Sequence, residues 1–247
     1  MRTVLITGAT SGIGRACAVS FHKAGYAVLA TGRNTAALAE LKNELGDNCY
    51  TMAFDVCDET AVKHAIESIP DEFKNIDVLV NNAGLALGLE PEYEGNTHDW
   101  SEMIDTNIKG LLGMTRLIVP NMLERGQGHI INIGSVAGDA AYAGGAVYCA
   151  TKAAVKAITD GLRIDLVDTP LRVTLIKPGL VETNFSNIRF HGDRDRASAV
   201  YRGIEALTAE DIADTVLYAA QAPAHVQIAE MLILATRQAN GSIIIRH

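Results

Sequence analysis

Short runs of β-branched and other apolar residues alternate along the chain with longer stretches in which apolar positions recur at helical spacing. Several of the short runs are apolar throughout, as expected for strands that helices cover on both faces. The alternation predicts an α/β fold built on one doubly wound parallel sheet of about seven strands, with helices on both faces. We expect strands at residues 3–7, 27–31, 50–54, 77–80, 129–134, 172–177 and 230–234, and helices near 13–24, 35–45, 59–68, 98–124, 148–167 and 209–220.

Residues 184–206 interrupt this alternation just after the sixth strand with a mixture of aromatic residues, charges and glycine. A long insertion at the carboxyl end of a strand is where a doubly wound sheet binds its ligands. We therefore predict a substrate lid over 184–206; the alternative is a solvated surface segment. No linker, repeat or low-complexity tract divides the chain, so we expect a single domain over residues 1–247.

Composition excludes several classes of function. The formal charge of −8 argues against a surface for nucleic acid or an anionic membrane, although a local site can still bind an anionic cofactor. The four cysteines form no Cys-x-x-Cys pair, so we expect neither a metal site nor a dithiol motif. The first apolar run is too short for a signal peptide or a membrane span. We expect a cytoplasmic protein with reduced thiols.

The first strand leads into a glycine-rich turn and then a helix, as in a Rossmann fold. Glycines in such a turn let the backbone approach a pyrophosphate, and the helix N-terminus offers unpaired N–H groups. The spacing here is Gly-x-x-x-Gly-x-Gly, which differs from the commonest dinucleotide fingerprint. The predicted cofactor-binding residues of this turn are Gly8, Thr10, Ser11, Gly12, Ile13 and Gly14.

The ends of the next strands indicate which dinucleotide binds. Arg33 follows the second strand, where a carboxylate would select NAD, whereas an arginine suits the 2′-phosphate of NADP(H). The alternative is a surface arginine that caps a loop. Asp55 and Val56, after the third strand, are placed to reach the adenine. After the fourth strand, Asn81, Asn82, Ala83 and Gly84 are predicted to bind a ribose, to form a stabilising polar turn, or both.

Tyr148 and Lys152 lie four residues apart in a stretch with helical character, and Ser135 closes the fifth strand upstream. The spacing places the tyrosine and the lysine on one helix face, where the ammonium is expected to lower the pKa of the phenol. Such a phenol can exchange a proton with a hydroxyl or carbonyl oxygen near neutral pH. By itself this spacing also fits an ordinary amphipathic helix with a surface lysine.

Taken together, these motifs resemble the short-chain dehydrogenase/reductase family, in its NADP-preferring branch, over residues 3 to about 235. The resemblance implies that Asn107, Ser135, Tyr148 and Lys152 are the catalytic residues. It places Ser135 and Tyr148 on the substrate oxygen, Tyr148 and Lys152 against the cofactor, and Asn107 beside a water that links Lys152 to solvent. It further implies that Pro178, Gly179, Val181 and Thr183 bind the nicotinamide end, although Pro178-Gly179 would also serve as a simple turn. The family suggests a homotetramer.

A narrower likeness, in residues 81–88, 105–110, 128–135, 185–190 and 222–226, is to bacterial NADP-dependent 3-hydroxy acid dehydrogenases of serine and allo-threonine, reducers of malonic semialdehyde, and sulfoacetaldehyde reductases. The chain departs from that group at Lys177, where a glutamate is expected, and in a less aromatic segment after Tyr148.

An acidic substrate requires a cation, and Arg189 is our candidate for bidentate binding of a carboxylate or sulfonate. His191, Arg194 and Arg196 are poorer candidates because their run looks solvated and mutually paired. The alternatives are a carbonyl reductase of neutral or sulfonated aldehydes and ketones, with Leu85, Leu87 and Leu89 near the site, and a regulator that binds NADP(H) without turnover.

Overall fold

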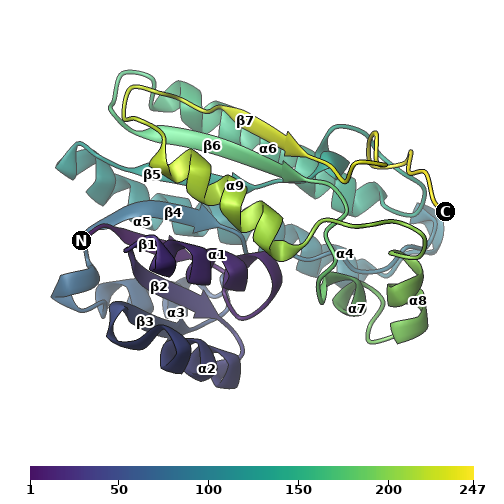
Figure 1. The fold of residues 1–247 in the computed structure, drawn as a ribbon, viewed down its shortest axis with the longest axis horizontal. Coiled ribbons are helices and arrows are strands. Elements are labelled where there is room, and N and C mark those ends of the chain that lie inside the picture. The colour runs from purple at the N-terminus through teal and green to yellow at the C-terminus, as the bar shows by residue number, and fades with distance from the viewer.

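The computed structural model describes residues 1–247 and contains one seven-stranded sheet in which every neighbouring pair of strands is parallel. The strands lie in the order β3-β2-β1-β4-β5-β6-β7 (Figure 1). Each predicted strand is present with its ends within one residue of the prediction, so the doubly wound parallel sheet is confirmed. The bounds are β1 Thr3–Ile6, β2 Ala27–Gly32, β3 Cys49–Ala53, β4 Ile76–Asn81, β5 His129–Ile133, β6 Arg172–Pro178 and β7 Glu230–Ile233.

Helices cover both faces of the sheet, which explains why its strands are apolar on both sides. Along β1, Val4 and Ile6 enter one core and Leu5 enters the other, because successive side chains of a strand point to opposite faces. The first core is completed by α1 (Gly12–Lys23), α2 (Thr35–Leu45) and α9 (Ala209–Gln221), and the second by α3 (Glu59–Glu67) and α5 (Leu111–Arg125). Figure 1 shows α1 and α9 in front of the sheet and α5 and α6 (Ala146–Asp165) behind it.

Short 3-10 turns connect these elements at Gly46–Asn48, Asp71–Phe73, Glu92–Glu94 and Val136–Gly138. No helix combines the length and the apolar character that crossing a membrane requires.

The single helix predicted near 98–124 is wrong, because the structure divides it. It consists of α4 (Thr97–Ile104), a π-helical turn over Asp105–Gly110 and then α5. The π turn contains Asn107, whose amide accepts from the backbone N–H of Leu85 and donates to its carbonyl, both at 2.8 Å. π turns inside helices occur frequently at functional sites, and hydrophobic periodicity does not reveal them.

The insertion, residues 184–206, contains two short helices, α7 (Phe185–Arg189) and α8 (Arg194–Ala199). The prediction that its charges pair with one another is wrong, because the insertion folds back onto α4 and the segment that precedes it. His191 contacts Asp99 at 3.0 Å and Arg196 contacts Glu90 at 3.5 Å. These two contacts attach the insertion to a segment about a hundred residues earlier in the chain.

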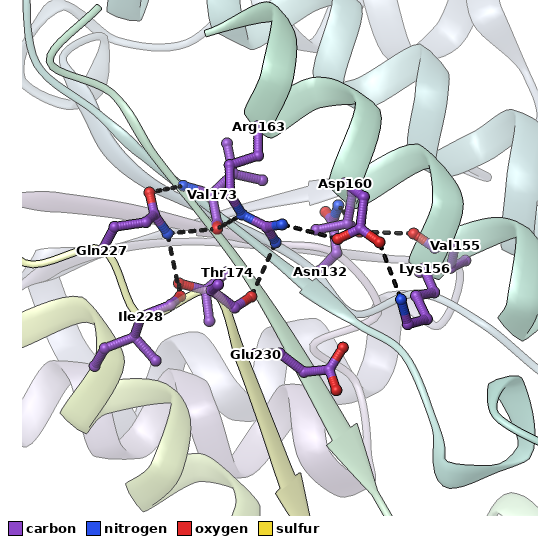
Figure 2. A network of polar contacts seen from close by, with 12 residues as sticks. Asn132, Val155, Lys156, Asp160, Arg163, Val173, Thr174, Gln227, Ile228 and Glu230 are labelled. Atoms are coloured by element: carbon purple, nitrogen blue, oxygen red, sulfur yellow. Dashed lines mark hydrogen bonds and ion pairs between the residues drawn. The ribbon is translucent and has the colours of Figure 1, made fainter. Parts of the chain in front are cut away.

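A polar network holds α6 against the edge of the sheet (Figure 2). Arg163 donates to the carbonyls of Val173 at 3.2 Å and Ala229 at 2.9 Å, and to Asp160 at 2.8 Å. Asn132 of the inner strand β5 also donates to the hydroxyl of Thr159 on α6, at 2.9 Å. Because α6 carries Tyr148 and Lys152, these bonds position the candidate chemistry relative to β5 and β6.

Candidate active site

A cleft of about 660 Å³ opens at the carboxyl ends of the strands. The strand order reverses between β1 and β4, which lie side by side although they are not consecutive, and doubly wound sheets bind ligands at such a point. The cleft runs from Arg33 and Asp55 at one end to Tyr148 and Arg189 at the other. Of the predicted cofactor-binding residues, those lining it are Gly8, Thr10, Ser11, Gly12, Ile13, Arg33, Asp55, Val56, Asn82, Ala83, Gly84, Tyr148, Lys152, Pro178, Gly179, Val181 and Thr183.

The glycine loop provides a cradle of backbone donors. Gly8 and Gly12 have φ angles of +66° and +51°, a region that favours glycine. A Cβ at Gly8 would meet the backbone of Ala83 at 3.0 Å. Helix α1 begins at Gly12 with no acidic residue in its first turn, and the side chain of Ser11 does not cap it. The free N–H groups and positive end of the helix dipole therefore face the cleft, and these features fit a pyrophosphate.

Gly14 and Asn81 lie behind the cleft wall. A Cβ at Gly14 would overlap the carbonyl of Gly8, so this glycine lets α1 pack closely on the loop. Asn81 is buried and donates to Thr115 at 3.1 Å and Asn132 at 2.9 Å. The structure therefore brings both residues to the loop as supports, and does not place them among the residues that line the cleft.

Arg33 lies at the far end of the cleft with 60% of its side chain exposed. Its Nη1 is 3.4 Å from Asp55 and 3.7 Å from Glu102. Burial opposes ionisation of Asp55, but the N–H of Cys57 and the charge of Arg33 outweigh it and lower the pKa of this carboxyl. Both carboxylates bind Arg33 loosely, so its guanidinium can also meet a phosphate.

Ser135, Tyr148 and Lys152 line the opposite end of the cleft. Tyr148 and Lys152 share one face of α6 and are 9% and 6% exposed. The hydroxyl of Ser135, which follows β5, accepts from the N–H of Ala137 at 3.1 Å. Lys152 donates to the carbonyl of Ile133 at 2.9 Å, and its Nζ lies 6.0 Å from the centroid of the Tyr148 ring.

Burial dominates the electrostatics of this pair. It raises the pKa of Tyr148 above its ordinary value, while a hydrogen bond with Ser135 and the charge of Arg189 act in the opposite direction. Burial also lowers the pKa of Lys152 to about 8. The expectation that Lys152 lowers the pKa of the phenol is therefore not met in this structure, because the ammonium is bound to Ile133 and burial disfavours both charges.

Asn107 is buried behind these residues and does not line the cleft. Besides Leu85, its amide donates to the hydroxyl of Thr151 at 3.0 Å. A Cβ at Gly84 would lie 3.1 Å from the Asn107 carbonyl oxygen and 3.5 Å from Lys152 Nζ, so glycine lets both side chains approach this strand end.

Lys177, the departure noted in the sequence, is buried at the end of β6. It contacts both oxygens of Asp139, at 2.8 and 2.9 Å, and also Glu230. Burial disfavours its charge, but the two carboxylates outweigh this and raise the pKa of Lys177. The ion pair with Asp139 connects β6 to the turn that follows Ser135. The carboxylates of Asp139 and Glu230 together compensate the positive charge of the buried lysine.

Sequence reasoning missed the C-terminal segment of the cleft. The amide oxygen of Gln238 accepts from the N–H of Leu180 at 2.8 Å, and a Cβ at Gly179 would overlap this oxygen. Gly241, Ile244 and Arg246 also line the cleft. No local signal marks these positions, because only the return of the chain past β7 brings them to the site.

Sequence reasoning also missed Tyr142, which lies beside Arg189 in the cleft wall. Arg189 donates from Nη1 to the Tyr142 hydroxyl at 2.9 Å and from Nε to the carbonyl of Gly88 at 3.0 Å. Leu85 and Leu89 line the same end, whereas Leu87 does not.

No group of three or more His, Cys, Asp or Glu side chains is arranged to hold a metal ion.

The fold and the cleft together define an α/β protein with a dinucleotide-type crevice. The chain belongs to the short chain dehydrogenase family, whose model matches residues 2–193. It is 50% identical over 241 residues to the NADP-dependent 3-hydroxy acid dehydrogenase YdfG of Escherichia coli K12, covering 97% of each chain. It is 46% identical over 239 residues to sulfoacetaldehyde reductase 2 of Chromohalobacter salexigens, covering 96% of this chain and 95% of that one.

Two solved structures extend the comparison. The closed form of serine dehydrogenase complexed with NADP+ superimposes with a TM-score of 0.96 and is 48% identical, with 99% of each chain covered. Serine dehydrogenase from Escherichia coli superimposes with a TM-score of 0.86 and is 46% identical, with 96% of this chain and 99% of that chain covered.

Proposed function

We propose that this protein is an NADP(H)-dependent oxidoreductase that interconverts the 3-hydroxyl and 3-oxo (or aldehyde) groups of small acids such as serine, allo-threonine or 3-hydroxypropionate. The observation that carries this proposal is that one cleft joins the glycine loop and Arg33 to Ser135, Tyr148 and Arg189. The relatives named above, which cover nearly the whole chain, support the cofactor and the substrate class.

The cofactor is held along the cleft. The glycine loop binds the pyrophosphate, Arg33 the 2′-phosphate, and Asp55 and Val56 the adenine. The strand end at Asn82, Ala83 and Gly84 faces the ribose. Pro178, Gly179, Val181 and Thr183 border the nicotinamide end, and residues 184–206 form a lid within the single domain.

The catalytic residues act on the substrate oxygen. When bound, NADP(H) supplies or accepts the hydride. Tyr148 takes the hydroxyl proton in oxidation and returns one to the oxygen in reduction. Ser135 hydrogen-bonds the same oxygen, an interaction worth a few kcal/mol in a dry site, on the order of that of an oxyanion-hole donor. Lys152 holds the nicotinamide ribose and passes protons, and Asn107 maintains the geometry behind it.

A second candidate function is reduction of neutral or sulfonated aldehydes and ketones. It is favoured by the apolar side chains of Leu85, Leu89 and Phe185 in the cleft wall, and by the similarity to sulfoacetaldehyde reductase 2. A regulator that only binds NADP(H) is disfavoured, because binding alone requires no buried tyrosine and lysine beside a serine.

We also propose a cytoplasmic homotetramer. Leu232 on the edge strand β7 and Ile164 and Val167 near the end of α6 are exposed apolar side chains that subunit contacts would cover. All four cysteines are free, which suits a reducing compartment. Light scattering after gel filtration tests the assembly, and cell fractionation tests the location.

The main test is an NADP+ reduction assay with L-serine, allo-threonine, 3-hydroxypropionate, isethionate and a neutral alcohol. We expect the 3-hydroxy acids to give the highest kcat/KM, and preference for the neutral alcohol would overturn the acid assignment. Tyr148→Phe is expected to lower kcat by about 10³-fold or more while NADP(H) affinity stays nearly unchanged. Absence of turnover on the whole panel would favour the regulator.

A further inference from the structure

Arg189 lies at the substrate end of the cleft, half-buried and without a carboxylate partner. Two neighbouring side chains in the insertion contact carboxylates, His191 with Asp99 and Arg196 with Glu90, but Arg189 takes part in no ion pair. It is bound only through Nε and Nη1, to the Gly88 carbonyl and the Tyr142 hydroxyl. Nη2 has no hydrogen-bond partner in the protein. An uncompensated guanidinium in a partly dry site favours an incoming anion.

Tyr142 is oriented to act with it. Because its hydroxyl oxygen accepts a hydrogen bond from Arg189, the hydroxyl proton is free to donate to another acceptor. The ring is confined, since a Cβ at Gly145 would overlap it and one at Gly241 would lie 3.6 Å away. The N–H of Gly145 also donates to the Tyr142 carbonyl at 3.0 Å. The phenol is therefore held in place before any ligand binds.

The two side chains lie beside the catalytic tyrosine. The guanidinium carbon of Arg189 is 5.4 Å from the Tyr142 ring centroid and 5.9 Å from the Tyr148 ring centroid. An anionic group bound to Arg189 would therefore lie close to the Tyr148 ring. This proximity is consistent with a short acid whose reacting hydroxyl is two carbons from its carboxylate.

We propose that Tyr142 and Arg189 together form the receptor for the acid group of the substrate, and that Tyr142 is a specificity-determining residue. This inference rests on the proposed function. The receptor offers the free Nη2 edge of the guanidinium and the phenol proton to two oxygens of one carboxylate or sulfonate. The paired donors, and not the charge of Arg189 alone, select acids over their neutral analogues.

The experiment compares 3-hydroxypropionate with 3-hydroxypropionamide, which differ only at the group that the receptor would bind. In Tyr142→Phe we expect kcat/KM for the acid to fall about 10-fold, mainly through KM, while kcat/KM for the amide changes less than about twofold. The matched control is Tyr201→Phe, a cleft tyrosine whose hydroxyl pairs with Ser186 and the Val181 carbonyl. We expect the control to leave the acid-to-amide ratio unchanged.

Arg189 variants separate charge from geometry. Arg189→Lys keeps the charge but not the planar fork, so we expect a partial loss of acid preference, and Arg189→Met is expected to abolish the preference. Isethionate in place of 3-hydroxypropionate distinguishes a sulfonate receptor from a carboxylate receptor. If Tyr142→Phe does not fold, as judged by circular dichroism, Arg189→Lys carries the test.

Equal losses on acid and amide in Tyr142→Phe would overturn the receptor, and so would a wild-type preference for the amide, while the oxidoreductase itself would stand. Absence of turnover with both substrates would overturn the proposed function instead. The receptor is then tested by calorimetric binding of malonate to the NADP+-loaded protein, which Tyr142→Phe should weaken about 10-fold. Unchanged malonate affinity would overturn it.

Discussion

The ammonium nitrogen of Lys152 lies 6.0 Å from the centroid of the Tyr148 ring and donates to the carbonyl of Ile133 at 2.9 Å. The two side chains thus share a helix face without a direct hydrogen bond between them. Burial raises the pKa of the phenol and lowers the pKa of the amine, so each group is shifted toward its neutral form. This arrangement governs how activity and stability should depend on pH.

We expect oxidation and reduction to respond differently to pH. Because burial raises the pKa of Tyr148, the phenol is protonated at neutral pH and ready to donate a proton in reduction. Oxidation needs the phenolate, so its kcat/KM should rise up to about tenfold per pH unit between pH 7 and 9, whereas reduction should not rise. Initial rates in both directions over this range test the prediction, and an oxidation rate that does not change with pH would contradict it.

Lys152→Met should stabilise the fold while inactivating the enzyme. The pKa of Lys152 is about 8 in the folded protein, against an ordinary 10.5, so below pH 8 the fold must bury a charge that the unfolded chain keeps in water. Removing the charge should raise the free energy of unfolding at pH 7 by at most about 3 kcal/mol. The gain should shrink between pH 8 and 10.5, because the folded lysine is then already neutral and the cost of neutralising the unfolded one falls as the pH approaches 10.5.

Urea unfolding at pH 7 and pH 10 measures this gain. Lys156→Met is the control, because Lys156 lies on the same helix but faces solvent and pairs with Asp160. A gain equally large at both pH values would mean that the methionine stabilises by packing alone.

Arg33→Ala should change cofactor preference. Arg33 is the cationic side chain at the adenine end of the cleft, held only loosely by Asp55 and Glu102. Its loss should raise KM for NADP+ about 10-fold or more and leave KM for NAD+ within about twofold, because only NADP+ carries the 2′-phosphate. Steady-state kinetics with both cofactors decide the matter, and equal effects on the two would refute the assignment.

His129→Gln should make the protein less sensitive to acid. His129 is buried in β5, with Nε2 bound to Thr174 at 2.7 Å and Nδ1 without a partner. Burial, together with Arg172, lowers its pKa to about 3. Below pH 6.5 the unfolded histidine takes up a proton that the folded one refuses, so this residue costs stability as the pH falls from 6.5 to 3.

The measurement is the free energy of unfolding at pH 6.5 and at pH 5. We expect the loss between these values to be about 2 kcal/mol smaller in the variant than in the wild type, since one proton corresponds to about 1.4 kcal/mol per pH unit. The comparison is made within each protein, so a lower stability of the variant at neutral pH does not affect it. Equal losses of unfolding free energy in the variant and the wild type would show that His129 is protonated in the folded protein.

The sequence by itself determined the architecture and the position of the cleft along the carboxyl ends of the strands. Apolar runs with branched side chains form strands, and the glycine loop, Arg33, Asp55 and Ser135 all follow strand ends, which lie together in any parallel sheet. Tyr148 and Lys152 share a face because of helical spacing alone. These features depend on local periodicity and on the order of strands and helices, and both can be read directly from the sequence.

Only the tertiary structure decided which residues meet from distant parts of the chain. Tyr142 meets Arg189, Lys177 meets Asp139 and Glu230, and Gln238 closes over Gly179. The same holds for burial, which outweighs the expected effect of Lys152 on Tyr148. Such pairings and degrees of burial arise from how the insertion, the π turn and the C-terminal segment pack on the sheet. Packing of this kind produces no repeating pattern of apolar and polar residues in the sequence.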